Sequence, residues 1–114
     1  MGISIFRGHS ANVKKRLFLA SKHFNIDVII LMDPRKSSYS STFTHKDIAN
    51  YKKHINNKVF VIHRFNECDE RKGTSGLNEF LIQANKVSDK NIYVSNWLRE
   101  VFYKGGIQRK NDEV

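Results

Sequence analysis

A short segment in the middle of the chain concentrates the residues that could do chemistry. The segment VIHRFNECDERKGT, residues 61–74, begins as an apolar run and continues into charged and polar side chains. Within it, His63 could act as an acid–base or sugar-binding group, because imidazole titrates near neutral pH. The carboxylates of Asp69 and Glu70 could serve as a pair, and the Cys68 thiol could act as a nucleophile. The segment therefore predicts a polar functional site that follows a buried strand.

Each of these residues also has a structural interpretation. Spacing alone favours a satisfied structural role for His63, and Asp69 and Glu70 could simply form salt bridges with the two basic residues that follow them. No second histidine is placed by sequence to activate Cys68, so a buried thiol is favoured there. Glu70 and Lys72 match the acidic-x-Lys pattern of metal-dependent nucleases, but they follow the strand instead of lying within it.

The elements that position this segment follow from the pattern of apolar residues. Short apolar runs rich in β-branched residues predict strands, and apolar residues at helical spacing predict helices. The expected strands lie near residues 3–6, 27–32, 59–62 and 92–94, and each is followed by a helix. This alternation predicts an α/β fold, a Rossmann-like three-layer sandwich with a mainly parallel sheet of about four strands and helices on both faces.

Capping signals mark two of the expected helices. Thr44 and Asp47 have the spacing of a capping box, with Asp in place of the usual Glu. Ser95 precedes the last apolar stripe as an N-cap residue. Gly105 and Gly106 follow that stripe in the usual helix-ending position.

The composition describes a single globular domain. The chain has 114 residues, 39% of them apolar, and its one cysteine excludes an internal disulfide. No apolar run approaches the roughly 18 residues of a membrane-spanning helix, and the first residues lack the features of a signal peptide. We therefore expect a cytoplasmic protein with a domain over residues 1–107 and a polar, frayed tail over residues 108–114.

The net charge of +9 lies in the first half of the chain. Residues 1–64 carry twelve Lys or Arg and three Asp, whereas residues 65–114 carry eight basic and eight acidic residues. Such a half should face nucleic acid, a phosphorylated substrate or an anionic membrane surface. A basic surface that merely aids solubility explains the same charge equally well.

In an open parallel sheet, ligands bind outside the carboxyl ends of the strands, where the charged segment is expected to lie. Gly8, after the first strand, could let the backbone approach a phosphate or sugar, or could simply permit a turn. We expect a partly buried His63 whose ring points into the crevice near the Gly8 loop. We also expect Asn66 and Asp69 to form hydrogen bonds that hold their own loop.

Two stretches resemble GT-B glycosyltransferases of the family-four type. VIHRFNECDERKGT is similar to a run of the form H-R-(I/V)-N-(E/D)-C-D-x-R-K-G-T that follows a core strand in that family. NIYVSNWLREVFYKGGI is similar to a later stretch, in which a strand ends in V-S and a W-L helix leads to a glycine. The stretches ILMDPR and LNEFLIQANKVSD are similar as well. The likeness covers residues 27–107 in order and spacing, and it departs from the family at Phe65, where an aliphatic residue is usual.

The resemblance implies an enzyme with two facing Rossmann-like domains, of which residues 1–107 form the N-terminal, acceptor-side one. The donor domain's Glu-x7-Glu spacing does not occur among Glu79, Glu100 and Glu113. We therefore expect an acceptor-side domain or fragment of a glycosyltransferase that transfers a sugar from a nucleotide-sugar donor. It would be inactive without the second domain, and the family implies no bound metal or cofactor.

The resemblance also assigns site residues. His63 matches the histidine that reaches the transferred sugar, and Gly8 loosely matches the glycine loop near the donor phosphates. The remaining motif residues are expected to bind substrate or hold the loop, namely Arg64, Asn66, Glu67, Asp69, Arg71 and Lys72. The expected partners are a nucleotide-sugar and a sugar acceptor reached through the missing domain. An anionic membrane surface with peripheral attachment, and self-association through an exposed apolar flank, are further expectations.

Two other functions stay open on the sequence. The basic half could make the chain an α/β nucleic-acid-binding module that places lysines and arginines on phosphates. Those residues would be Lys14, Lys15, Lys52, Lys53 and the Arg35–Lys36 loop. A small nuclease would instead use Asp33, Asp69, Glu70 and Lys72.

Overall fold

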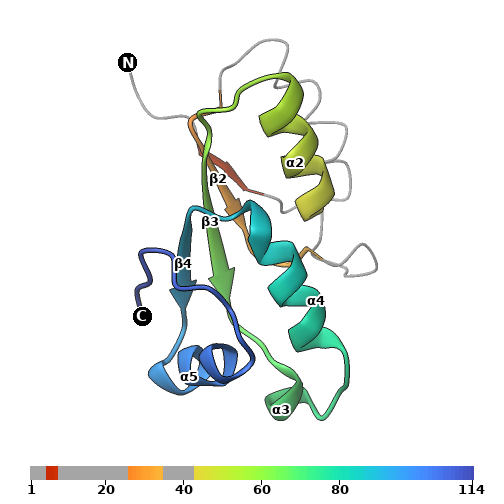
Figure 1. The fold of residues 1–114 in the computed structure, drawn as a ribbon, viewed down its shortest axis with the longest axis vertical. Helices are drawn as coiled ribbons and strands as arrows, with labels where there is room; N and C mark the ends of the chain where they lie inside the picture. The colour runs from red at the N-terminus through yellow and green to blue at the C-terminus, as the bar shows by residue number, and fades with distance from the viewer. Residues whose placement is uncertain (1–4, 8–25, 35–42) are drawn as a thin grey trace.

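Strands and helices alternate along the chain (Figure 1). The computed structural model describes residues 5–7, 26–34 and 43–114. The strands are β1 (Ile5–Arg7), β2 (Val28–Leu31), β3 (Phe60–Phe65) and β4 (Lys90–Tyr93). The helices are α2 (His45–His54), α3 (Asp69–Lys72), α4 (Leu77–Ala84) and α5 (Asn96–Lys104), with a short 3-10 helix η1 (Asn85–Val87).

The four strands form one sheet in the order β1-β2-β3-β4, and each neighbouring pair is parallel. The predicted α/β fold with a parallel sheet is confirmed, and the arrangement is compatible with a Rossmann-like sandwich. The register aligns Leu31 with His63, and His63 with Asn91. Because all strands are parallel, their carboxyl ends meet at one edge of the sheet.

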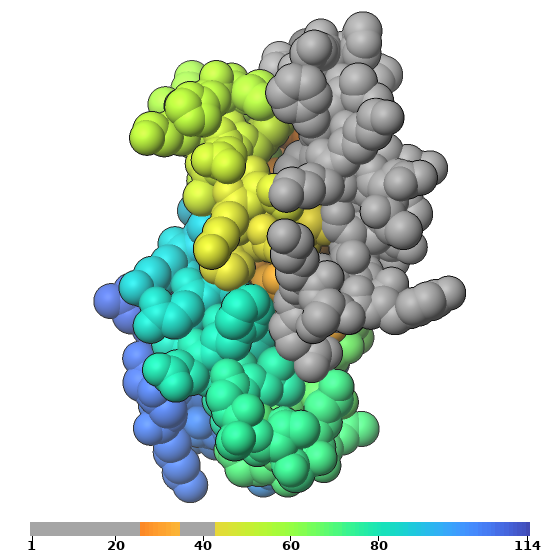
Figure 2. Space-filling view, turned by 90° about the vertical axis from the view of Figure 1, so that its right-hand side faces the viewer, coloured from red at the N-terminus to blue at the C-terminus, as the bar shows by residue number. Residues whose placement is uncertain are grey.

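The side chains of β3 alternate between two environments. Val61, His63 and Phe65 are buried, whereas Ile62 and Arg64 between them are only half-buried. Successive strand side chains point to opposite faces, so one face of the sheet forms the core. The space-filling view shows α2 and α4 together over that side (Figure 2). We expected helices on both faces, but all the described helices with buried apolar stripes pack on one face.

Two apolar clusters fill the space between the sheet and these helices. In the first, Ile48 and Tyr51 of α2 pack with Val61 and the buried residues of β2. In the second, α4 and α5 pack around Phe65, whose ring centroid lies 4.8 Å from Tyr93 and 4.5 Å from Phe102. Burying a Phe side chain contributes about 1.5–3 kcal/mol, so Phe65 stabilises this end of the sheet.

The predicted caps are present. Asp47 donates its backbone amide to Thr44 Oγ1 at 3.4 Å, and the Thr44 amide donates to Asp47 Oδ2 at 2.9 Å. Ser95 Oγ accepts from the Leu98 amide at 3.1 Å. Gly106, just past α5, has φ of 90°, a left-handed conformation that glycine adopts without strain. Among the described residues, no helix is long and apolar enough to cross a membrane.

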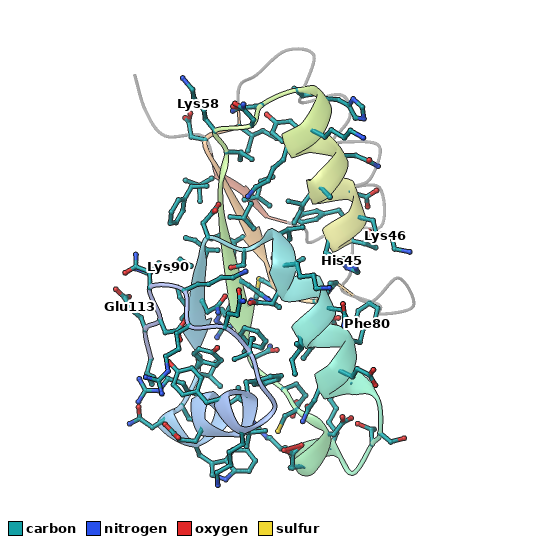
Figure 3. All side chains as sticks on the ribbon, viewed as in Figure 1. His45, Lys46, Lys58, Phe80, Lys90 and Glu113 are labelled. Atoms are coloured by element: carbon teal, nitrogen blue, oxygen red, sulfur yellow. The ribbon has the colours of Figure 1, made fainter. Side chains whose placement is uncertain are left out.

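The C-terminal residues correct the expectation of a frayed tail. The Asn91 amide donates to the Lys110 carbonyl at 3.2 Å, and Glu113 bonds the backbone of Asn91 and Tyr93 at 3.0 and 2.9 Å. An ion pair between Lys90 Nζ and Glu113 Oε1, 2.8 Å apart, adds to these backbone hydrogen bonds (Figure 3). The polar tail is held because the outer edge of β4 offers it backbone partners, which composition alone does not reveal.

Candidate functional site

A small pocket lies at the carboxyl ends of β2 and β3, where the sequence predicts a site. Its lining combines the end of β2, the turn after β3 and two apolar residues of α4, namely Met32, Asp33, Arg64, Phe65, Asn66, Glu67, Leu77 and Leu81. The cavity has a volume of about 20 Å³, which is room for about one water. The pocket is therefore a shallow recess, too small to enclose a sugar ring.

Three of the predicted site residues, Arg64, Asn66 and Glu67, meet at this recess. Glu67 Oε1 is buried and accepts no hydrogen bond. It lies 3.7 Å from Nε of Arg71, whose side chain is 63% exposed, so the pair contributes at most about 1 kcal/mol. Asn66 is exposed and makes no side-chain hydrogen bond within the described residues, which corrects the expectation that it holds the loop. Glu67 thus lines the recess and has one buried carboxylate oxygen that accepts no hydrogen bond.

Asp69 holds the loop, as the sequence predicts, and it does so by capping α4. Its Oδ1 accepts from Thr74 Oγ1 at 2.7 Å and from the Leu77 amide at 3.1 Å. Its Oδ2 accepts from the Asn78 amide at 2.9 Å. The residue that precedes α4 is Gly76, which has no side chain to cap the helix. Asp69 satisfies the orphan amides of that helix instead.

The bonds to Asp69 also act on its charge. The Asn78 amide, the Thr74 hydroxyl and the Leu77 amide lower the pKa of Asp69, because hydrogen bonds to a carboxylate favour its charged form. Asn78 completes the cluster by donating to Glu70 Oε1 at 2.6 Å and by accepting from the Asp69 amide at 2.8 Å. The two carboxylates are therefore engaged in the fold and do not form a catalytic pair.

The other residues of the segment divide between core and surface. Cys68 is fully buried, as the structural interpretation of this thiol predicts. Arg71 and Lys72 lie exposed on the single turn of α3, a helix that the sequence does not indicate. Gly8 lies outside the described residues.

His63 is fully buried, which corrects the expectation of a partly exposed ring at the crevice. Its ring packs on Phe65 with centroids 4.0 Å apart, and Asn85 Nδ2 lies 2.9 Å from its Nδ1. The physical reason is the alternation of β3, which places His63 on the same face as Val61 and Phe65. That face is covered by α4 and η1, so the ring is closed off from the recess.

Burial sets the protonation state of this ring. It lowers the pKa of His63 to about 3, because a site without water disfavours the imidazolium form, and the electrostatic effect of Lys110 and His45 lowers it further. With Asn85 donating to Nδ1, the ring proton lies on Nε2. Nε2 is buried and has no hydrogen-bond partner. His63 is therefore a neutral core residue near pH 7 and lies out of reach of a ligand at the recess.

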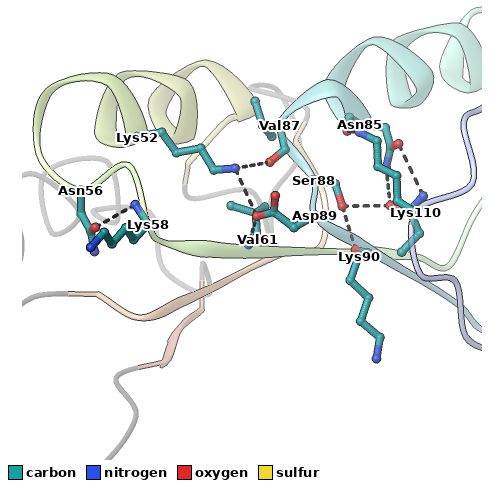
Figure 4. Close-up of polar contacts among 11 residues, drawn as sticks. Lys52, Asn56, Lys58, Val61, Asn85, Val87, Ser88, Asp89, Lys90 and Lys110 are labelled. Carbon is teal, nitrogen blue, oxygen red and sulfur yellow. Dashed lines mark hydrogen bonds and ion pairs between the residues drawn. The ribbon is translucent and has the colours of Figure 1, made fainter.

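The partners of His63 are residues that the sequence reasoning missed. Asn85 Nδ2 also donates to Asn91 Oδ1 at 2.6 Å, and Ser88 Oγ lies 2.9 Å from the same oxygen. Lys110 Nζ donates to the Asn85 carbonyl at 2.7 Å (Figure 4). The signal in the sequence is position: Asn85 continues the buried stripe of Leu77 and Leu81 in α4. A polar residue on a buried stripe requires a buried polar partner.

A second missed residue, Asp89, joins three elements. Its Oδ2 accepts from the Val61 amide at 2.8 Å and from Lys52 Nζ at 3.2 Å. Lys52 Nζ also donates to the Val87 carbonyl at 3.1 Å (Figure 4). Lys52 is thereby engaged within the fold, although the sequence also allowed it to contact a phosphate.

The recess thus carries a carboxylate and an amide at the carboxyl edge of a parallel sheet, the place where such sheets bind ligands. In the described ranges, no group of three or more His, Cys, Asp or Glu residues is arranged to hold a metal ion. No protein-family model, curated protein or solved structure matches this chain.

Proposed function

We propose that this chain forms the acceptor side of a glycosyltransferase, with the nucleotide-sugar donor bound by a second Rossmann-like domain. The observation that carries the proposal is the meeting of Arg64, Asn66 and Glu67 at the carboxyl ends of β2 and β3. These are residues of the segment that resembles family-four GT-B enzymes. The proposal includes a cytoplasmic location, with the basic half of the chain turned towards a phosphorylated or membrane-borne acceptor.

The chemistry of the recess suits a sugar hydroxyl. Glu67 Oε1 has an unused acceptor position, and the exposed Asn66 amide can both donate and accept. A carboxylate within hydrogen-bond reach of an acceptor hydroxyl can take its proton as the new glycosidic bond forms. We therefore assign to Glu67 the leading acceptor-binding role at the recess, and His63, to which the sequence gave the contact with the transferred sugar, no longer takes that part.

His63 takes a different part in this proposal. It packs on Phe65, the residue that precedes Asn66, and accepts from Asn85 at the end of α4. By fixing the last residues of β3 against α4, it positions the turn that carries Asn66 and Glu67. His63 is therefore a positioning residue, because it acts through this turn and does not contact a ligand itself. Replacing it should lower both the stability of the fold and the affinity for the ligand.

The size of the recess explains why a second domain is needed. With room for about one water, it can contact one edge of a sugar but cannot exclude solvent from a reacting centre. A facing domain would supply the missing wall and the donor. The chain alone should therefore bind acceptor sugars weakly and turn over no nucleotide-sugar.

A titration followed by NMR tests this proposal. Monosaccharides and sugar phosphates are added to the ¹⁵N-labelled chain, and the amide shifts of Asp33, Asn66 and Glu67 are followed. We expect millimolar binding that shifts these amides and is weakened by Glu67→Gln. The matched control is Glu79→Gln, which changes an exposed carboxylate on α4. Shifts confined to other regions, or equal binding by Glu67→Gln, would contradict the assigned site.

The nucleic-acid alternative draws on a different part of the chain. Residues 8–25 and 35–42 contain six Lys or Arg and no acidic residue, and they lie outside the described ranges. Of the two α2 lysines that the alternative uses, Lys53 is exposed and Lys52 is bonded to Asp89. The alternative therefore depends mainly on residues 14, 15, 35 and 36, and salt-dependent binding separates it from the sugar-binding proposal.

A further inference from the structure

The face of the sheet opposite α2 and α4 carries a band of apolar side chains. They alternate with the buried residues of β2, β3 and β4, and they are Val28, Ile30, Phe60, Ile62, Ile92 and Val94. Phe60 is 39% exposed and Val94 is 42% exposed, and the others are partly exposed. We call this band the open face.

The topology explains why none of the described helices lies on the open face. The strands are in chain order across the sheet, and parallel connections are right-handed in nearly all proteins. Because the strand order runs in one direction, right-handed connections place α2, which joins β2 to β3, and α4, which joins β3 to β4, on the same side. Figure 1 shows α2 and α4 on one side, and the labelled Lys90 and Glu113 lie on the other in Figure 3. Purely parallel sheets are almost always covered on both faces by helices, whereas only one face carries a helix among residues 26–34 and 43–114.

The charge on the open face indicates what would cover it. Arg64 points to this face by the alternation of β3 and has no ion pair within the described residues. Lys90 lies on the same face and has Glu113 as its ion-pair partner, whose side chain is 63% exposed. A covering element therefore gains by placing carboxylates beside Arg64 and Lys90 and apolar residues between them.

The dimensions of the face suit helices. β3 has six residues, which at about 3.3 Å each span about 20 Å, the length of a helix of about 13 residues. Four strands about 4.8 Å apart give a width for one or two helices of about 10 Å diameter. A second copy of the chain fits less well, because it would bring Arg64 and Lys90 against the same cations and carries the same net charge of +9.

From these observations we propose that the open face binds an amphipathic helix with an acidic polar side, supplied by a partner polypeptide. The apolar stripe of that helix would lie on Phe60, Ile62 and Ile92, and its carboxylates would flank the stripe next to Arg64. This interface lies on the face of the sheet opposite α4 and shares Arg64 with the proposed sugar-binding recess, so Phe60→Asp tests the interface without changing the recess.

Fluorescence anisotropy with three labelled synthetic peptides tests the inference on the full chain. One peptide, of about 14 residues to match the face, has leucines at helical spacing and glutamates elsewhere. The second has the same composition in scrambled order, and the third has lysines in place of the glutamates. We expect the first peptide to bind at least about tenfold more tightly than the others, because it alone has both the stripe and the complementary charge.

Two variants locate the binding. Phe60→Asp should weaken the first peptide about tenfold, whereas the control Ile55→Asp changes an equally exposed apolar residue at the end of α2 and should leave binding unchanged. Arg64→Glu should reverse the preference between the acidic and basic peptides. Circular dichroism establishes that each variant is folded before it is compared.

Three results would overturn the inference. Equal binding of the scrambled acidic peptide would show general attraction to a basic protein. Absence of binding by all the peptides would show that the face does not accept a helix. A dimer in sedimentation equilibrium that Phe60→Asp dissociates, without peptide binding, would assign the face to a second copy of the chain.

Discussion

Replacing His63 with phenylalanine should remove most of the acid sensitivity of this fold. The neutral ring is buried and its pKa is lowered to about 3, whereas an unfolded histidine has a pKa of about 6.5. Between these values the unfolded chain binds a proton that the folded chain does not, so acid favours unfolding. The stability associated with the neutral ring is complete above pH about 6.5 and is lost as the pH falls towards 3.

The size of this effect follows from the unfolded state. At pH 5 the unfolded histidine lies about 1.5 units below its pKa, which is about 2 kcal/mol at 1.36 kcal/mol per unit. That is a large part of the roughly 5–15 kcal/mol that stabilises a typical domain. The result at pH 5 does not depend on the exact folded pKa, provided that it stays well below 5.

Urea unfolding followed by circular dichroism at pH 7.5 and pH 5 measures the effect. The single tryptophan, Trp97, is 53% exposed, so its fluorescence is a poor probe of unfolding. His63→Phe keeps the ring packing on Phe65 but leaves Asn85 with one acceptor fewer, which should cost about 1 kcal/mol at pH 7.5. Its loss of stability between the two pH values should be about 2 kcal/mol smaller than that of the parent chain.

The exposed His54 at the end of α2 provides the control. His54→Gln should retain the full acid sensitivity, because it leaves the buried ring in place. His45 has a lowered pKa through partial burial and the nearby Lys46, and it contributes equally to the parent chain and to His63→Phe. Equal acid sensitivity in His63→Phe and the parent chain would refute the burial of His63 and return it to the recess.

Three further results are expected. Asp69→Ala should speed hydrogen exchange at the Leu77 and Asn78 amides, because both lose their acceptor, whereas Glu70→Gln should leave these amides protected; unchanged exchange in Asp69→Ala would disprove the capping role. The pure chain should not hydrolyse UDP- or GDP-sugars in a coupled nucleotide assay, and turnover that Glu67→Gln abolishes would contradict the need for a second domain. Binding to DNA in a mobility-shift titration should be weak and little changed by Lys14→Glu with Lys15→Glu; tight, salt-sensitive binding that this pair removes would favour the nucleic-acid alternative.

The features that the sequence predicts correctly depend on neighbours in the chain. The strands near Val28 and Val61 are short apolar runs, and their β-branched residues specify extended backbone wherever they pack. The capping box of Thr44 and Asp47 and the cap at Ser95 need only residues three positions apart. Such patterns depend only on residues that are close together in the sequence, so they can be recognised without knowing the fold.

The features that sequence reasoning missed depend on distant partners. The alternation of β3 places His63 on the core face, but the polar partner that satisfies it there is Asn85 of η1, 22 residues later, and no local pattern around His63 indicates that contact. The continuous apolar run before Asp33 suggests a strand buried on both faces, yet the described helices cover only one. Which face receives a helix depends on strand order, and strand order is a property of the whole chain. The sequence predicted the position of the recess at the carboxyl ends of the strands. It did not predict that His63, to which it gave the main chemical role, is buried away from the recess.

The order of the strands has a consequence for how the chain acquires its structure. Each described strand lies beside the strand that precedes it in the sequence, so no strand has to be inserted between two that are already paired. Each pairing nevertheless joins residues far apart in the sequence, such as Val28 with Phe60 and Ile62 with Lys90, and the loop-closure entropy of such non-local pairs slows folding. During synthesis, the sheet can grow at one edge as each strand and its helix leave the ribosome. Residues 110–113 then bond to the outer edge of β4, so that this edge of the described sheet is covered as soon as they have been made.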